Sequence, residues 1–235
     1  MAISCLRKDA LVPRPMKIDF VSDISCPWCI IGLRGLEEAL ARTGDLVDAK
    51  IRFHPFELNP TMPAGGQNIV EHIAQKYGSS REQTAANREM IRSRAAELGF
   101  TMATSDQSRI YNTFDAHRLL HWAALEGRQA ALKHALFHAY FTNGQDPSDA
   151  AVLVAAAGKA GLDGEAAAEI LATGRYADEV REAEKLWQSR GITAVPAVVI
   201  NERYLISGGQ PPEAFEQALR DIAAESSVAA GVGYS

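Results

Sequence analysis

Two cysteines separated by two residues, Cys26 and Cys29, constrain this chain of 235 residues more than any other feature. They follow an apolar run that ends at Val21 and open a segment whose leucines recur at helical spacing. Side chains three residues apart lie about one helical turn from each other, so the two sulfurs can form or open a disulfide with little backbone movement. Unpaired N–H groups and the dipole at a helix N-terminus also favour a thiolate. The pattern predicts a redox-active dithiol.

The two thiols are expected to have different roles. Cys26, at the exposed end of the helix, is predicted to be the solvent-accessible nucleophile that forms a mixed disulfide with the substrate. Cys29 lies one turn deeper and is followed by two isoleucines, so we expect it to be largely buried, with a raised pKa, and to act as the resolving thiol. Pro27 suits the first helical turn, and the rigid ring of Trp28 is expected to control access to the sulfur.

A metal site is the alternative for such a cysteine pair. Zinc would need a second pair of ligands, and the third cysteine, Cys5, lies in a leader with proline and arginine, where we interpret it as a bystander thiol. His117 with His121, and His134 with His138, lie at i,i+4 spacing and could bracket a metal. No glutamate completes an H-E-x-x-H motif, so we expect no metal ligands and interpret these histidines as structural.

Apolar periodicity predicts the order of the elements. Strands are expected at Lys17–Ser22 and Val47–Phe56, with a helix at Pro27–Arg42 between them. Strand signals return only in a hairpin, Val198–Ile200 with Tyr204–Ile206. The segment between these strands is almost wholly helical in pattern, and a last helix closes the chain. These helices are expected at Asn68–Tyr77, Ser80–Leu98, Thr113–Leu125, Arg128–Phe141, Ser148–Ala160, Gly164–Ala172, Tyr176–Gln188 and Pro212–Ala224.

This order predicts an α/β protein with a thioredoxin-like fold, in which a large all-α insertion separates a β-α-β half from an α-β-β-α half. We expect an N-terminal extension over residues 1–16 and a disordered tail over 227–235. The thioredoxin-like domain is expected to comprise 17–66 and 189–226, and the inserted helical domain 67–188.

Pro196 stands at the entrance of the predicted hairpin. An average X-Pro bond is cis in only about one case in twenty in folded proteins, but thioredoxin-like folds place a cis-proline beside the redox disulfide at this topological position. We therefore predict a cis Val195–Pro196 bond. Because proline lacks an N–H, the backbone of Val195 is free to pair with an extended substrate.

Five segments occur in the same order as in a known family: Ser22–Gly32, Pro55–Pro60, Asn112–Trp122, Val195–Pro196 and Ser207–Pro212. Together they resemble the FrnE-like branch of the DsbA family of dithiol–disulfide oxidoreductases. The resemblance implies a thiol–disulfide oxidoreductase or isomerase that acts through a mixed disulfide. It also implies that Asn112 and His117, in the helical domain that faces the redox site of relatives, contact the substrate.

The chain departs from these relatives in two residues that bear on substrate preference. Ile30 stands where tyrosine is frequent after the second cysteine, and Ala197 follows the proline where threonine is common. The tail also lacks the second cysteine pair that some relatives carry, so no mechanism that needs a second disulfide is expected. The glycine pair Gly208-Gly209 is expected to allow close backbone approach beside the active site.

Two other functions remain open. Glutathione-dependent 2-hydroxychromene-2-carboxylate isomerases and kappa-class glutathione transferases resemble this chain in architecture and would act on a small aromatic or polyketide-type substrate. They carry serine where Cys26 stands, so the two retained sulfurs favour redox chemistry. A non-enzymatic metal-binding or chaperone-like module is the third interpretation.

Charge and hydropathy limit the partners. The net charge is −5 and no basic run occurs, which argues against nucleic acid, and no apolar stretch is long enough to span a bilayer. The N-terminus has no apolar core typical of a secretory signal, so a cytoplasmic location is expected. We expect a protein or small-molecule disulfide as substrate, no cofactor beyond the disulfide, and glutathione as co-substrate or a thioredoxin-type protein as recycling partner. A monomer or a homodimer is expected.

Overall fold

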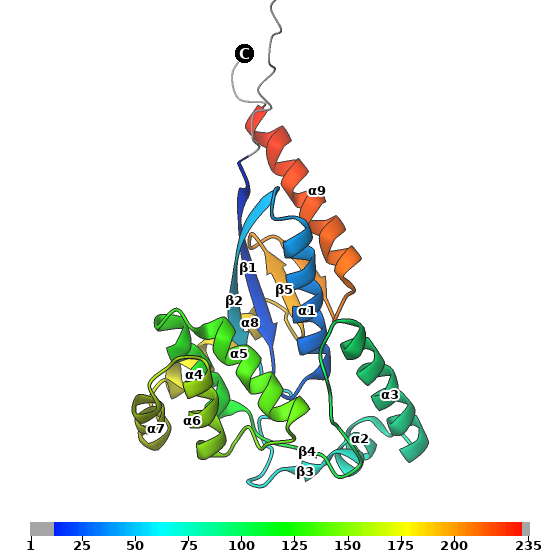
Figure 1. The fold of residues 1–235 in the computed structure, drawn as a ribbon, viewed down its shortest axis with the longest axis vertical. Helices are drawn as coiled ribbons and strands as arrows, with labels where there is room; N and C mark the ends of the chain where they lie inside the picture. Colours follow the sequence, from blue (N-terminus) through cyan, green and yellow to red (C-terminus); the bar gives the residue numbers. More distant parts are fainter. Residues whose placement is uncertain (1–11, 232–235) are drawn as a thin grey trace, which may run out of the picture.

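The computed structural model describes residues 12–231, with side chains as far as residue 225 (Figure 1). It opens with β1 (Arg14–Ser22), α1 (Pro27–Arg42) and β2 (Val47–Pro55). β1 begins three residues before the expected start because its parallel pairing with β2 extends back to Arg14, beyond the apolar run. Cys5 lies outside the described residues.

A four-stranded sheet forms the centre of the thioredoxin-like part, in the order β2-β1-β5-β6. β5 (Ala197–Ile200) and β6 (Tyr204–Ser207) are the predicted hairpin. β1 pairs parallel with β2 and antiparallel with β5, which places Phe20 between Phe53 and Val198. β1 is therefore an inner strand, and its last five residues are all buried.

Helices cover both faces of this sheet. α1 packs along α9 (Pro212–Gly231) on one face, where Leu36, Phe215 and Leu219 join the main core with Ile18 of β1 (Figure 1). On the other face, α8 (Ala177–Ser189) contributes Trp187 to a smaller cluster with Val21 and Ala197. The strand end that leads into α1 is thus held from both sides.

The segment predicted as the insertion, 67–188, contains α2 (Ile69–Tyr77), α3 (Arg81–Glu97), α4 (Phe114–Leu125), α5 (Gln129–Phe137), α6 (Ala150–Lys159) and α7 (Gly164–Thr173), and its last helix is α8. It is not all-α as predicted. A short ladder pairs β3 (Gln67–Asn68) with β4 (Arg109–Ile110), and the guanidinium of Arg109 donates to the carbonyl oxygens of the turn glycines Gly65 and Gly66. Two-residue strands carry no periodic signal, which is why the sequence pattern did not reveal them.

The helix expected at Arg128–Phe141 is also different. α5 ends at Phe137 and continues as a π-helical turn, η1 (His138–Thr142). The wider turn places the adjacent rings of Tyr140 and Phe141 in the core, with ring centroids 4.7 Å apart. π-helical turns are rare and are often found near functional sites.

The last helix is longer than predicted. α9 continues past the expected end at Ala224 to Gly231, because the alanine-rich segment contains no helix breaker before that glycine. Residues 227–231 therefore belong to α9 rather than to a disordered tail, and residues 232–235 lie outside the described part. In residues 12–231, no helix has the length and apolar character required to cross a membrane.

Candidate active site

The dithiol lies at the junction of β1 and α1. Cys26 is the N-cap residue of α1, and its carbonyl oxygen accepts a hydrogen bond from the backbone N–H of Cys29 at 3.0 Å. Both thiols are free. Burial raises the pKa of Cys29 well above its ordinary value, and the neighbouring Cys26 thiol raises it further. Cys29 is thus buried as expected, and this burial accounts for its raised pKa.

Cys26 is less exposed than predicted, with only 4% of its surface accessible. Its Sγ donates to the carbonyl oxygen of Val195 at 3.7 Å, so the loop before Pro196 lies over the sulfur. The Val195–Pro196 bond is cis, as the sequence analysis expects. The loop that covers this helix end comes from a segment about 170 residues further along the chain. Local sequence patterns do not reveal so distant a contact, and for this reason an exposed helix end was expected.

Glycines allow both the cis-proline loop and the segment after β6 to approach α1 closely. A Cβ on Gly32 would lie 3.1 Å from the Pro196 ring, and one on Gly209 would lie 2.8 Å from the carbonyl oxygen of Trp28. Gly208, with φ +82°, has a backbone conformation that favours glycine. The predicted role of Gly208-Gly209 in close backbone approach is therefore confirmed.

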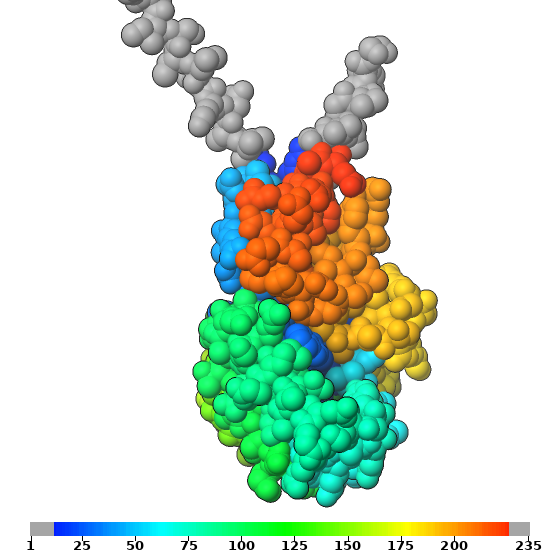
Figure 2. Space-filling model, turned by 90° about the vertical axis from the view of Figure 1, so that its right-hand side faces the viewer, coloured from blue at the N-terminus to red at the C-terminus, as the bar shows by residue number. Residues whose placement is uncertain are grey.

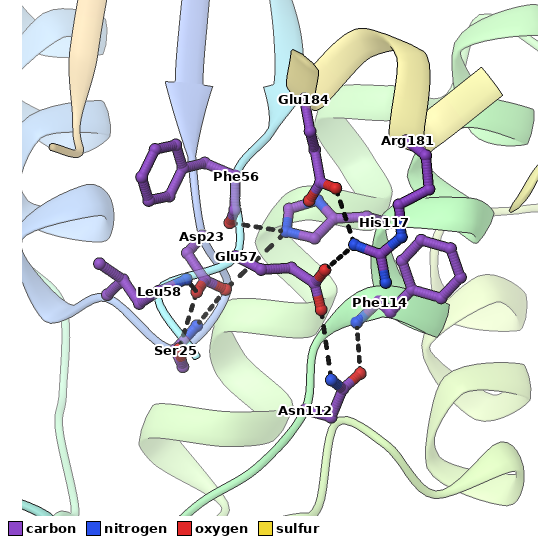
Figure 3. A network of polar contacts seen from close by, with 10 residues as sticks. All are labelled: Asp23, Ser25, Phe56, Glu57, Leu58, Asn112, Phe114, His117, Arg181 and Glu184. Atoms are coloured by element: carbon purple, nitrogen blue, oxygen red, sulfur yellow. Dashed lines mark hydrogen bonds and ion pairs between the residues drawn. The ribbon is translucent and has the colours of Figure 1, made fainter. Parts of the chain in front are cut away.

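Asp23 organises the turn that leads into the dithiol. Its carboxylate accepts hydrogen bonds from the backbone N–H and hydroxyl of Ser25, at 3.2 and 3.1 Å, and from the N–H of Leu58 at 2.7 Å (Figure 3). The imidazole of His117 lies 3.8 Å away. Burial alone would raise the pKa of Asp23, but the neighbouring imidazole of His117 and the hydrogen bond from Leu58 hold it below its usual value. A buried carboxylate thus joins β1 to the loop after β2.

A second group of polar residues holds the other end of that loop (Figure 3). The carboxylate of Glu57 pairs with Arg181 of α8, which also pairs with Glu184 at 2.8 Å. The guanidinium of Arg181 lies 3.8 Å from the ring centroid of Phe114. Asn112 donates to Glu57 at 3.2 Å. These contacts tie the loop to α8 and to the start of α4.

Asn112 and His117 do not occupy the positions expected of substrate-binding residues. Neither lines the cavity that contains Cys26. The Asn112 side chain accepts from the N–H of Phe114 at the start of α4, and the His117 side chain is buried, 3.2 Å from the carbonyl oxygen of Phe56. Both residues position the loop instead, because the polar backbone of the loop requires partners when buried.

A cavity of about 820 Å³ opens onto Cys26. Its walls come from the start of α1, the loop after β2, helices α2 and α3, and the segment Thr193–Val195. In Figure 2, the blue segment around the β1–α1 junction is visible at the base of a hollow beside the teal and green helices. The lining is largely apolar but includes Lys76 and Arg88. The Nη1 atom of Arg88 is buried without a hydrogen-bond partner among the described residues.

Sequence reasoning missed Lys133 of α5, which is fully buried near the dithiol. Burial lowers the pKa of Lys133 to about 8, while the neighbouring Cys29 and Asp23 act to raise it. The signal was present in the sequence, because Lys133 lies among Gln129, Leu132, Leu136 and Phe137 on the core-facing stripe of its helix.

The histidine pairs have separate partners. His121 stacks on Tyr176, with ring centroids 5.0 Å apart, and His138 lies 4.9 Å from the ring of Phe100. His134 pairs with Glu37 at 2.6 Å. Within the described part of the chain, no group of three or more histidine, cysteine or acidic side chains gathers in a way that could hold a metal ion.

A cysteine pair at a helix start, beside a cis-proline loop in a four-stranded sheet, defines a thioredoxin-like protein. The model of the DSBA-like thioredoxin domain matches residues 17–220, and the chain belongs to this family. It is 29% identical over 205 residues to the protein YwbO of Bacillus subtilis (strain 168), covering 87% of this chain and 96% of YwbO.

Solved structures agree with this assignment. A probable DsbA oxidoreductase from Streptomyces coelicolor is 37% identical, with a TM-score of 0.81 over 88% of this chain and 89% of that one. Two others share the fold at lower identity. A cytosolic disulfide reductase, DsbM, from Pseudomonas aeruginosa, solved with GSH, is 19% identical (TM-score 0.56, 87% of this chain and 98% of that one). A 2-hydroxychromene-2-carboxylate isomerase is 16% identical (TM-score 0.66, 90% and 98%).

Proposed function

We propose that this protein is a thiol–disulfide oxidoreductase of the FrnE-like type, with Cys26 as nucleophile and Cys29 as resolving thiol. The observation that carries the proposal is the placement of Cys26. Its sulfur lies at the base of a cavity, next to the carbonyl oxygen of Val195 and one turn from a second, buried thiol.

The reaction proceeds by two thiol–disulfide exchanges. The Cys26 thiolate attacks one sulfur of a substrate disulfide, forming a mixed disulfide and releasing the other substrate sulfur as a thiolate. Cys29 loses its proton and attacks the Cys26 sulfur, which releases the second substrate thiolate and leaves a Cys26–Cys29 disulfide. The substrate gains two electrons, and the protein is returned to the dithiol by an external reductant: a thioredoxin-type protein, or glutathione when the substrate is a disulfide other than glutathione disulfide. The reverse sequence oxidises a substrate dithiol.

Two features around Cys26 support substrate binding. The carbonyl oxygen of Val195 can accept a hydrogen bond from an extended peptide or a peptide-like thiol. The largely apolar cavity suits a compact ligand, and the exposed Lys76 in its wall offers a cation to an anionic group on that ligand. We therefore include small disulfides with a carboxylate, such as glutathione disulfide, among the substrates.

The alternative function is that of a glutathione-dependent isomerase or transferase. The same cavity supports it, because a small aromatic substrate could bind there. The fold alone is shared with the isomerase of known structure, and both cysteines are present here, which favours redox chemistry. A cytoplasmic location is part of the proposal and is consistent with the cytosolic reductase among the structural neighbours.

Replacing the cysteines one at a time tests the proposal. We expect Cys26→Ser to abolish reduction of insulin and of glutathione disulfide. Cys29→Ser should instead accumulate a mixed disulfide on Cys26, visible by intact-protein mass spectrometry. Cys5→Ser serves as the control and should retain full activity. Equal activity of the wild type and Cys26→Ser would refute the assignment, and turnover of a small aromatic substrate by Cys29→Ser would favour the isomerase.

A further inference from the structure

Lys133 is an unusual buried cation. It projects from α5 of the inserted segment and is 0% exposed. Its Nζ lies 4.9 Å from the ring centroid of Phe137 and 6.0 Å from that of Phe53, and it has no hydrogen-bond acceptor among the described residues. A buried charge without a partner is costly, so the position of this lysine requires an explanation.

The dithiol offers an explanation. The groups that act electrostatically on Lys133 are Cys29, Asp23 and Cys26. Asp23 already accepts hydrogen bonds from Ser25 and Leu58 and pairs with His117. The anion left without a counter-charge is the thiolate that Cys29 must form when it resolves the mixed disulfide.

A second cavity, of about 750 Å³, has Lys133 in its wall. It lies between β2, α4, α5 and α8, and it shares no lining residue with the cavity that contains Cys26. Lys133 therefore reaches the dithiol from the inserted segment and not through the substrate cavity. The other titratable groups in the wall of this second cavity are Lys50, Arg52, His54, His117, His121 and Glu179.

We propose that Lys133 is the buried counter-charge of the Cys29 thiolate and acts as a positioning residue for the resolving step. The inference rests on the proposed function. When Cys29 loses its proton to solvent, the ammonium of Lys133 offsets the negative charge that burial would otherwise disfavour. The thiolate then attacks the Cys26 sulfur, the mixed disulfide breaks, and the substrate sulfur leaves as a thiolate.

Stopped-flow reaction with dithiobis(nitrobenzoate) tests this in a Cys5→Ser background. The first release of nitrothiobenzoate reports attack by Cys26, and the second reports resolution by Cys29. We expect Lys133→Met to slow the second release at pH 7 by about tenfold or more, since removal of a nearby opposite charge raises a thiol pKa by at least about one unit. The first release should change less, and Lys50→Met, an exposed residue of the same cavity, should change neither.

The pH profile separates this role from a structural one. Because burial lowers the pKa of Lys133 to about 8, its assistance should fade above that pH in the wild type. Lys133→Arg, whose side chain stays charged, should keep the assistance at higher pH. An unchanged second release in Lys133→Met, or identical pH profiles for the wild type and Lys133→Arg, would overturn the inference. Absence of the first release in the parent protein would instead refute the proposed function.

Discussion

The dithiol is positioned mostly by residues outside the Cys26–Cys29 pair. The free backbone groups of the turn before α1 are held by the carboxylate of Asp23, which no disulfide chemistry requires. Its low pKa shows that the hydrogen bonds and the imidazole of His117 outweigh the cost of burial. A charged side chain at this point therefore serves to fix the position of Cys26 relative to the loop at Leu58.

Asp23 makes the stability of the fold depend on pH. Its folded-state pKa is lower than the ordinary 3.8, so its contribution is present above about pH 4 and is lost as the pH falls through the folded-state pKa. We expect Asp23→Asn to lower the free energy of unfolding by about 2 kcal/mol at pH 7. In urea denaturation under reducing conditions, the difference from the wild type should shrink below pH 4. The exposed Asp45→Asn should show no such effect, and a pH-independent difference for Asp23→Asn would contradict the assignment.

At the scale of elements, the loop after β2 connects three parts of the chain. Through Glu57 it is bound to α8 by Arg181 and to the start of α4 by Asn112. Gln129 of α5 bonds both the N–H and the carbonyl oxygen of Phe53 in β2, at 3.0 and 2.9 Å, and so covers the edge of the sheet. The loop that borders Cys26 is therefore positioned by helices rather than by the sheet alone.

Replacing Arg181 by methionine tests this connection. Glu57, whose side chain is 3% exposed, would lose its counter-charge. We expect a loss of stability of about 1–2 kcal/mol, less than for a fully buried pair because the Arg181 side chain is 41% exposed. Hydrogen exchange should accelerate in residues 56–58. Lys185→Met, on an exposed turn of the same helix, is the control, and unchanged exchange in the loop would show that Arg181 does not hold it.

At the scale of the whole molecule, the inserted segment and the thioredoxin-like part share one core. A single cluster of buried side chains contains Phe20 and Leu36 of the sheet and α1 together with Leu132 and Leu136 of α5. Two parts of one chain that share a buried core usually unfold together. We therefore expect the boundaries proposed from the sequence to describe topology rather than separate folding units.

A shared core predicts a single unfolding transition. Two single-tryptophan variants test this, one retaining Trp28 beside the dithiol and one retaining Trp122 in the inserted segment. In each variant, the urea midpoint from tryptophan fluorescence should equal the midpoint from far-UV circular dichroism. Substitution of the remaining tryptophans by phenylalanine keeps the aromatic volume similar. A Trp122 transition at lower urea than the circular dichroism transition would show that the inserted segment unfolds by itself.

Local patterns were sufficient for much of the fold. The bounds of α1 follow from Pro27 at its first position and the leucine spacing behind it, and the structure has the same bounds. The hairpin and the β-α-β start were predicted because strand alternation and turn residues act over a few positions. The small two-residue ladder and the π-helical turn were missed, since neither has a characteristic period.

The sequence by itself determined the family, the order of elements and the pair of thiols, because these depend on neighbouring residues and on motifs that recur in order. Only the tertiary structure decided how the thiols are covered and charged. Val195 reaches Cys26 from 169 positions away, and Arg181 reaches Glu57 from 124. Helical spacing places Lys133 on the core-facing stripe of α5, but only the packing of α5 against β2 brings it near Cys29. Such contacts depend on the packing of whole elements, and side-chain spacing along the chain carries no record of it.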